Sequence, residues 1–173
     1  MKQTLRLFQF TTALLFATAL TLSSCSTASQ QRITTFIESE YLPYGDDGTS
    51  TITGEAFLRM MDGSLRKCTG FPVLLNPATT YSAEWYERNV VGGIPLEPAD
   101  PRALKFLRQT VGDSEGKFEF RNLPPGEYYA ACVITVHIPI GYGSTMPRAY
   151  VARSNGKITL GPDQQLKAVL TNY

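Results

Sequence analysis

From Thr49 to the C-terminus, apolar and polar residues alternate with a period of two, the pattern of strands that bury one face. In "TSTITGEAFLRM" one face collects Ile52, Gly54, Ala56 and Leu58. The alternation returns in "LKFLRQTV", "KFEFRNL" and "EYYAACVITVHI", and we expect further strands at 147–152, at 157–160 and in the closing "QQLKAVLTN". The run "FPVLLNP" is more continuously apolar, which is typical of a strand buried on both faces.

Turn-forming residues separate these segments. Asp113-Ser114-Glu115-Gly116 has the chemistry of a type I hairpin connection. In Pro124-Pro125-Gly126 a proline fixes φ near −65° and the glycine supplies the positive φ of a type II turn, so the chain must reverse. Short strands joined by tight turns, with little helix, predict an all-β fold, a seven-stranded antiparallel β-sandwich.

One Pro- and Gly-rich insertion interrupts this pattern between Asn76 and Leu104. Within it, "YSAEWYERNV" predicts a single helix that Ser82 caps and in which Tyr81 and Trp85 lie one turn apart. A loop of this length inside a compact domain is usually either functional or poorly ordered.

The N-terminal residues have the pattern of an export signal. Lys2 and Arg6 precede an apolar run over 7–20 that is short for a transmembrane helix. The run ends in "LSSC", which resembles the bacterial lipobox and implies that Cys25 is lipidated and becomes the mature N-terminus. An ordinary secreted protein, cleaved within 24–28, is the alternative.

Three regions follow from these patterns: a lipoprotein signal peptide over 1–24, a flexible tether and lead-in segment over 25–48, and the β-sandwich over 49–173. Ser26 follows the lipobox cysteine, which resembles the outer-membrane class of lipoproteins. We therefore expect an exported protein, anchored by palmitate and other acyl chains to a bacterial membrane, and facing the periplasm or the cell surface.

The strand residues resemble those of the carboxypeptidase regulatory-like family, also called prealbumin-like or transthyretin-like. The matching pieces are Thr53-Gly54, the "PVLL" of the second apolar strand, and the run from Asp113 to Tyr128 that contains "GKFEF" and "LPPGEY". This resemblance covers roughly 49–173 and implies a Greek-key sandwich. In that family the domain is an accessory to peptidases and carries none of their zinc ligands.

The composition excludes several classes of function. Sixteen Lys and Arg balance fifteen Asp and Glu, and no basic stripe could follow nucleic-acid phosphates. His137 is the only histidine, whereas a zinc site or a nucleophilic triad needs several suitable groups together. We expect no catalytic residues, no metal and no cofactor, so the chain is predicted not to be an enzyme.

Two cysteines remain beside Cys25. Cys68 and Cys132 could pair in a disulfide, since export leads to an oxidising environment. Alternatively, Cys132 is a small buried apolar residue and Cys68 a loop thiol. The sequence leaves both open, because it does not fix whether the two Cα atoms lie within about 7 Å.

Tyr81, Trp85 and Tyr86 form the one aromatic cluster outside a strand. Exposed, these rings could stack on sugars or anchor a protein partner; packed down, they would cover the sandwich. The first hypothesis is a non-catalytic, membrane-anchored module with a structural or protein-binding role. A carbohydrate-binding module is the alternative. A small hydrolase is a third, and it needs a second titratable group beside His137 or Cys132.

Overall fold

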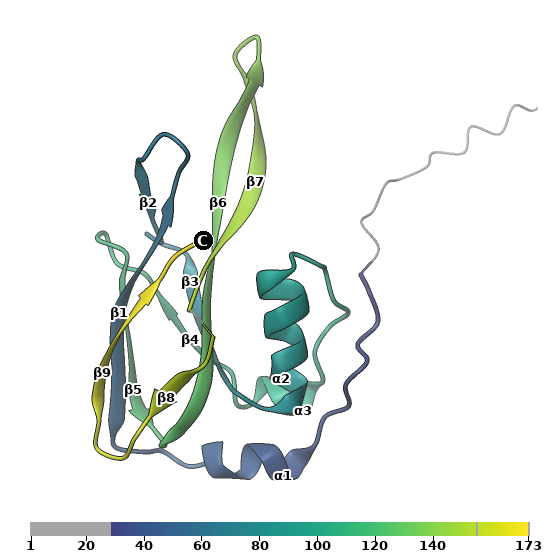
Figure 1. Ribbon diagram of the computed structural model, residues 1–173, viewed down its shortest axis with the longest axis vertical. Coiled ribbons are helices and arrows are strands. Elements are labelled where there is room, and N and C mark those ends of the chain that lie inside the picture. The colour runs from purple at the N-terminus through teal and green to yellow at the C-terminus, as the bar shows by residue number, and fades with distance from the viewer. Residues whose placement is uncertain (1–28, 155, 173) are drawn as a thin grey trace, which may run out of the picture.

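The computed structural model describes residues 29–154 and 156–172, so the predicted signal peptide and the predicted lipidation site Cys25 lie outside the described residues. Two β-sheets form the body, and the helices lie together beside one of them (Figure 1). Between residues 29 and 172, no described helix combines the length and the apolar character that crossing a membrane requires.

The first sheet is built around β1 (Ser50–Arg59). Its antiparallel partners are β2 (Leu65–Lys67) and β5 (Lys117–Leu123), and its parallel partner is β9 (Gln165–Leu170). Gly54 lets these strands approach, because a Cβ at this position would lie 2.2 Å from the backbone oxygen of Ala168 in β9.

The second sheet has the order β4 (Arg108–Val111), β3 (Pro72–Pro77), β6 (Gly126–Gly141) and β7 (Ser144–Arg153), and β8 (Ile158–Leu160) also pairs with β6. Beyond the body of the sandwich, β6 and β7 continue together as a projecting hairpin (Figure 1). The two sheets are mostly antiparallel and form an all-β sandwich, as predicted.

The strand count and one pairing differ from the prediction. The described residues form nine strands, whereas the sequence predicted seven, and β9 runs parallel to β1. Alternation shows which residues share a face but carries no information on strand direction. All three residues of β2 are exposed, so this strand has no apolar face to reveal it. The Greek-key, prealbumin-like topology stays a prediction.

The main core lies between the two sheets. Its fully buried members include Ile52 and Leu58 from β1, Leu75 from β3, and Leu123 at the end of β5. Tyr128 joins them from β6, and its hydroxyl donates to the backbone oxygen of Pro124 at 2.7 Å. This bond ties the strand to the Pro-Gly turn before it, so the aromatic residue serves both the turn and the core.

Cys68 and Cys132 form a disulfide in the structure, with their Cα atoms 6.7 Å apart. Cys68 directly follows β2 of the first sheet, and Cys132 lies in β6 of the second. Both side chains are fully buried, so the bond crosses the core from one sheet to the other. Of the two alternatives that the sequence left open, the structure therefore has the bridged one.

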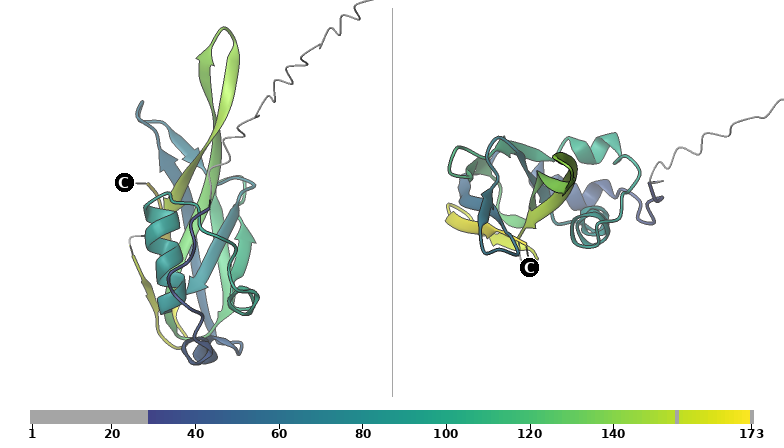
Figure 2. Two further views of the ribbon diagram at one scale, coloured as in Figure 1. Left: turned by 90° about the vertical axis from the view of Figure 1, so that its right-hand side faces the viewer. Right: turned by 90° about the horizontal axis from the view of Figure 1, so that it is seen from above.

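The insertion forms a helical layer against the second sheet (Figure 2). A helix begins as α2 (Thr80–Glu84), continues as the π-helical segment η2 (Trp85–Val91), and is followed by α3 (Pro101–Leu104). The N-cap of α2 is Thr79, whereas the sequence predicted that Ser82 caps the helix. Ser82 instead completes a capping box with Thr79. The expected strand over 104–111 is shortened to β4 because Asp100 caps α3 and Pro101 starts it.

The segment before the sandwich runs along this helical layer. Gln30 pairs with Leu96 in an isolated parallel bridge, although the sequence predicted a flexible tether over 26–35. Further along lie α1 (Glu38–Tyr41) and a short 3₁₀ turn, η1 (Leu42–Tyr44). Tyr41 is buried and stacks with Phe36, and Phe36 meets the Tyr81 ring of α2 edge-on with ring centroids 6.2 Å apart, so the lead-in segment packs on the insertion.

Candidate functional site

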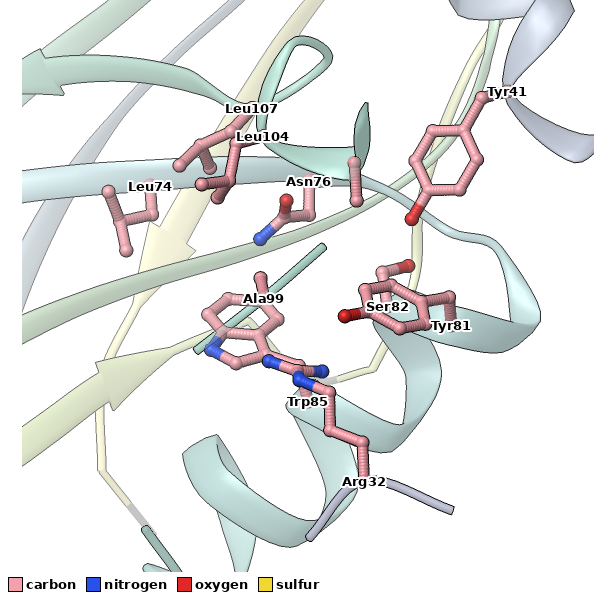
Figure 3. Close-up of a pocket in the computed structure, with 11 residues that line it drawn as sticks. Arg32, Tyr41, Leu74, Asn76, Tyr81, Ser82, Trp85, Ala99, Leu104 and Leu107 are labelled. Carbon is pink, nitrogen blue, oxygen red and sulfur yellow. The ribbon is translucent and has the colours of Figure 1, made fainter. Parts of the chain in front are cut away.

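A pocket of about 210 Å³ lies where the lead-in segment, the insertion and the outer face of β3 meet (Figure 3). Its lining is mostly apolar and contains a single charged side chain; the lining residues are Arg32, Tyr41, Leu74, Asn76, Tyr81, Ser82, Trp85, Ala99, Ala103, Leu104 and Leu107. Ligand pockets for drug-sized molecules usually measure about 300–1,000 Å³. This pocket therefore suits a small group such as one sugar ring.

The strand β3 supplies the base of the pocket. Its alternation sends Val73, Leu75 and Pro77 into the sandwich core, so Leu74 and Asn76 face the insertion. The Asn76 amide points into the pocket (Figure 3) and forms no side-chain hydrogen bond with the part of the chain that the structure describes. An amide of this kind can both donate to and accept from a ligand hydroxyl.

Two aromatic residues of the helix border the pocket. Tyr81 is 5% exposed, and its hydroxyl accepts a hydrogen bond from the backbone N–H of Asp100 at 2.7 Å. Trp85, one turn later, is half-buried, and its indole N–H has no hydrogen-bond partner among residues 29–154 and 156–172. A partly exposed indole with a free donor offers both a flat apolar face and a polar contact.

Arg32 supplies the positive charge of the pocket. Its guanidinium lies over the Tyr81 ring, 4.8 Å from the ring centroid, which is a cation–π geometry. Its Nε donates to the backbone oxygen of Glu97 at 3.2 Å. Nη1 is buried and has no hydrogen-bond partner in the described residues. An unpaired buried donor of a charged group costs free energy unless something accepts from it.

Glu84 holds the segment that carries Arg32. This buried carboxylate accepts hydrogen bonds from the backbone N–H groups of Ile33 and Thr34, both at 2.9 Å, and from the Thr34 hydroxyl. It also forms an ion pair with Arg88, one turn later in the same helix. Burial alone would raise the pKa of Glu84, but the hydrogen bonds from Thr34, Ile33 and Arg88 outweigh it and lower the pKa to about 2.

Tyr86 does not belong to the pocket, although the sequence grouped it with Tyr81 and Trp85. It is 2% exposed and stacks on Tyr129 of β6, with ring centroids 4.3 Å apart. Its hydroxyl accepts from the backbone N–H of Gly156 at 3.2 Å and donates to the backbone oxygen of Ser154. Tyr86 therefore fastens the helix to the second sheet.

The other residues singled out in the sequence lie away from this pocket. His137 is exposed on β6 and lines a separate hollow beside Asp62 and Arg66. Asp62 is engaged with Ser64, whose backbone N–H and hydroxyl donate to it. Within the described ranges, His, Cys, Asp and Glu residues do not gather in a group of three or more that could hold a metal ion.

Sequence reasoning missed Arg32 and Asn76. Asn76 could have been found, because a polar residue in an otherwise apolar strand marks the face that turns away from the core. Arg32 gave no signal, since its partner Glu97 lies 65 positions away along the chain.

Among solved structures, the chain is similar to that of a putative carbohydrate binding protein from Pseudomonas aeruginosa. The two chains are 26% identical, the TM-score is 0.69, and the match covers 80% of this chain and 99% of the other. No protein-family model matches the sequence. No curated protein matches it either.

Proposed function

We propose that this chain is a non-catalytic carbohydrate-binding module that holds one sugar ring in the pocket beside Trp85. The observation that carries the proposal is the pairing of a half-buried indole with polar groups that have no protein partner in the described residues, on Asn76 and Arg32. Sugars present apolar C–H faces and hydroxyl groups, so they need a flat aromatic surface together with converging donors and acceptors. The name of the Pseudomonas aeruginosa protein supports the same class of ligand.

The size of the pocket favours the end of a glycan chain. Its volume of about 210 Å³ lies below the usual range of about 300–1,000 Å³ for pockets that hold drug-sized ligands. Tyr81 is almost fully buried, which leaves Trp85 as the aromatic side chain that a ligand can reach. A single aromatic stacking surface, bordered by the Asn76 amide, suits recognition of one sugar unit better than recognition of a long, flat glycan chain.

The test is a glycan array probed with the purified protein and with Trp85→Ala. We expect a defined set of glycans to bind the parent protein and to be lost in the variant, because the stacking surface is removed. Tyr142→Ala is the matched control: Tyr142 is fully exposed at the tip of the hairpin, far along the sheet from the pocket. Absence of glycan binding by the parent protein would contradict the proposal and favour the hypothesis of a structural or protein-binding role.

We further propose that the module is a lipoprotein anchored through Cys25, with a prealbumin-like Greek-key sandwich as its exported domain. The lipobox-like "LSSC" and the signal-like residues before it support the anchor. Several acyl chains hold a domain at a bilayer far better than one chain does. Cys25→Ala should move the protein from the membrane to the soluble fraction; unchanged membrane retention would contradict the lipid anchor.

A further inference from the structure

We infer that the sugar bound in this pocket carries a carboxylate, as a uronic acid does, and that Arg32 recognises it. This inference rests on the proposed function and adds the charge class of the ligand. Among the residues that the structure describes, Arg32 is the only charged one that lines the pocket. A neutral sugar could satisfy Asn76 and the indole N–H, but it would leave the guanidinium without a counter-ion.

The carboxylates near Arg32 are committed to other groups. Glu84 pairs with Arg88, and Asp100 with Arg102. Glu97 directs a carboxylate oxygen to the backbone N–H of Arg32, at 2.9 Å, and forms no ion pair with its guanidinium. Across the part of the chain that the structure describes, Arg32 therefore has no ion-pair partner.

Two contacts orient the guanidinium. Its Nε donates to the backbone oxygen of Glu97, and its flat face lies over Tyr81. The remaining nitrogens are left for a ligand: Nη1 is the buried donor that lacks a partner, and Nη2 makes no hydrogen bond with residues 29–154 or 156–172. Two neighbouring N–H groups of one planar guanidinium match the two oxygens of a carboxylate.

Because Nη1 of Arg32 is buried, a carboxylate can bind it only after the guanidinium changes its orientation. Water does not reach this nitrogen, so the guanidinium edge must rotate toward the pocket. Such a rotation exchanges an unpaired charged donor for a charge-assisted hydrogen bond, which favours the bound state. The sugar ring would then lie against Trp85, with Asn76 available for a hydroxyl group (Figure 3).

The experiment compares glucuronate and galacturonate oligosaccharides with their methyl esters and with the neutral glucose and galactose oligomers, by calorimetry on the purified protein. We expect a uronate to bind about tenfold to a hundredfold more tightly than its ester or neutral counterpart. Arg32→Gln should remove this preference. Arg102→Gln should keep it, because Arg102 is an exposed arginine that lines a second hollow, which Arg32 also borders, and does not line the pocket itself.

Each result has one meaning. Equal binding of the uronate, its ester and the neutral sugar overturns the inference and leaves the proposed function standing. Binding of none of these sugars overturns the inference, and the glycan array then decides the proposed function separately. Loss of the preference in Arg102→Gln as well as in Arg32→Gln overturns the assignment to Arg32. The ester comparison uses only the parent protein, so it holds even if Arg32→Gln fails to fold.

Discussion

The carboxylate of Glu84 accepts a hydrogen bond from the backbone N–H of Thr34 at 2.9 Å, across 50 positions of sequence. With the equivalent bond from Ile33, this contact fastens the lead-in segment to the helix of the insertion. Arg32 directly precedes Ile33 in that segment, so the geometry of the pocket depends on Glu84, a carboxylate that does not line it.

Glu84→Gln should loosen this segment. A glutamine amide cannot form the ion pair with Arg88. It also has one acceptor oxygen where Glu84 uses two, one for Ile33 and one for Thr34, so we expect the free energy of unfolding to fall by about 1–3 kcal/mol. Hydrogen exchange at 30–36 should become faster than in the parent protein. Glu87→Gln, an exposed position in the same helix, is the control and should leave both quantities unchanged; equal effects of the two variants would contradict the role of Glu84.

The same contact should respond to acid. The pKa of Glu84 falls from its ordinary value of 4.5 in the unfolded chain to about 2 in the folded protein. Its stabilising effect is therefore complete above pH 4.5 and is lost as the pH falls through about 2. The amide resonances of Ile33 and Thr34, followed by NMR, should shift together in this range. In Glu84→Gln the shifts should be absent; shifts that persist there would assign the titration to another group.

Tyr86→Phe should lower stability without affecting ligand binding. The variant keeps the stacking on Tyr129 but loses the hydroxyl contacts with Ser154 and Gly156. We expect the free energy of unfolding, measured with urea, to fall by about 1–2 kcal/mol. Tyr142→Phe at the exposed hairpin tip should change it by less than about 0.5 kcal/mol. Loss of glycan binding in a folded Tyr86→Phe protein would mean that Tyr86 belongs to the site after all.

The disulfide between Cys68 and Cys132 should make a large contribution to stability. It closes a loop of 64 positions, for which chain entropy predicts a stabilisation of about 4 kcal/mol. Denaturation of the parent protein with and without a reductant measures this contribution directly. Equal stability of the oxidised and reduced forms would show that the bond does not restrain the chain.

The sandwich could be predicted from the sequence because each strand and turn has a signal in residues that are neighbours along the chain. The alternation in β1 and the Pro-Gly turn before β6 each depend on neighbouring residues alone. The parallel pairing of β9 with β1 could not be predicted, since it joins residues more than a hundred positions apart. Short-range patterns do not encode such pairings.

The pocket was only partly predictable for the same reason. Helical spacing correctly grouped Tyr81 with Trp85, which both line it. Tyr86 follows Trp85 directly and therefore points elsewhere, since consecutive residues of a helix do not share a face. Arg32 enters the site through a segment that had been expected to be flexible, and only the contacts with Glu84 and Glu97 bring it there.

Trp85 is the single tryptophan of the chain, so emission excited at wavelengths that tyrosine does not absorb reports on the pocket. The most direct test titrates the purified protein with the glycan that binds best on the array, while calorimetry measures the same binding. We expect the emission of Trp85 to change with the calorimetric dissociation constant and to saturate with it. Binding seen by calorimetry with no change in Trp85 emission would place the sugar elsewhere and contradict this account.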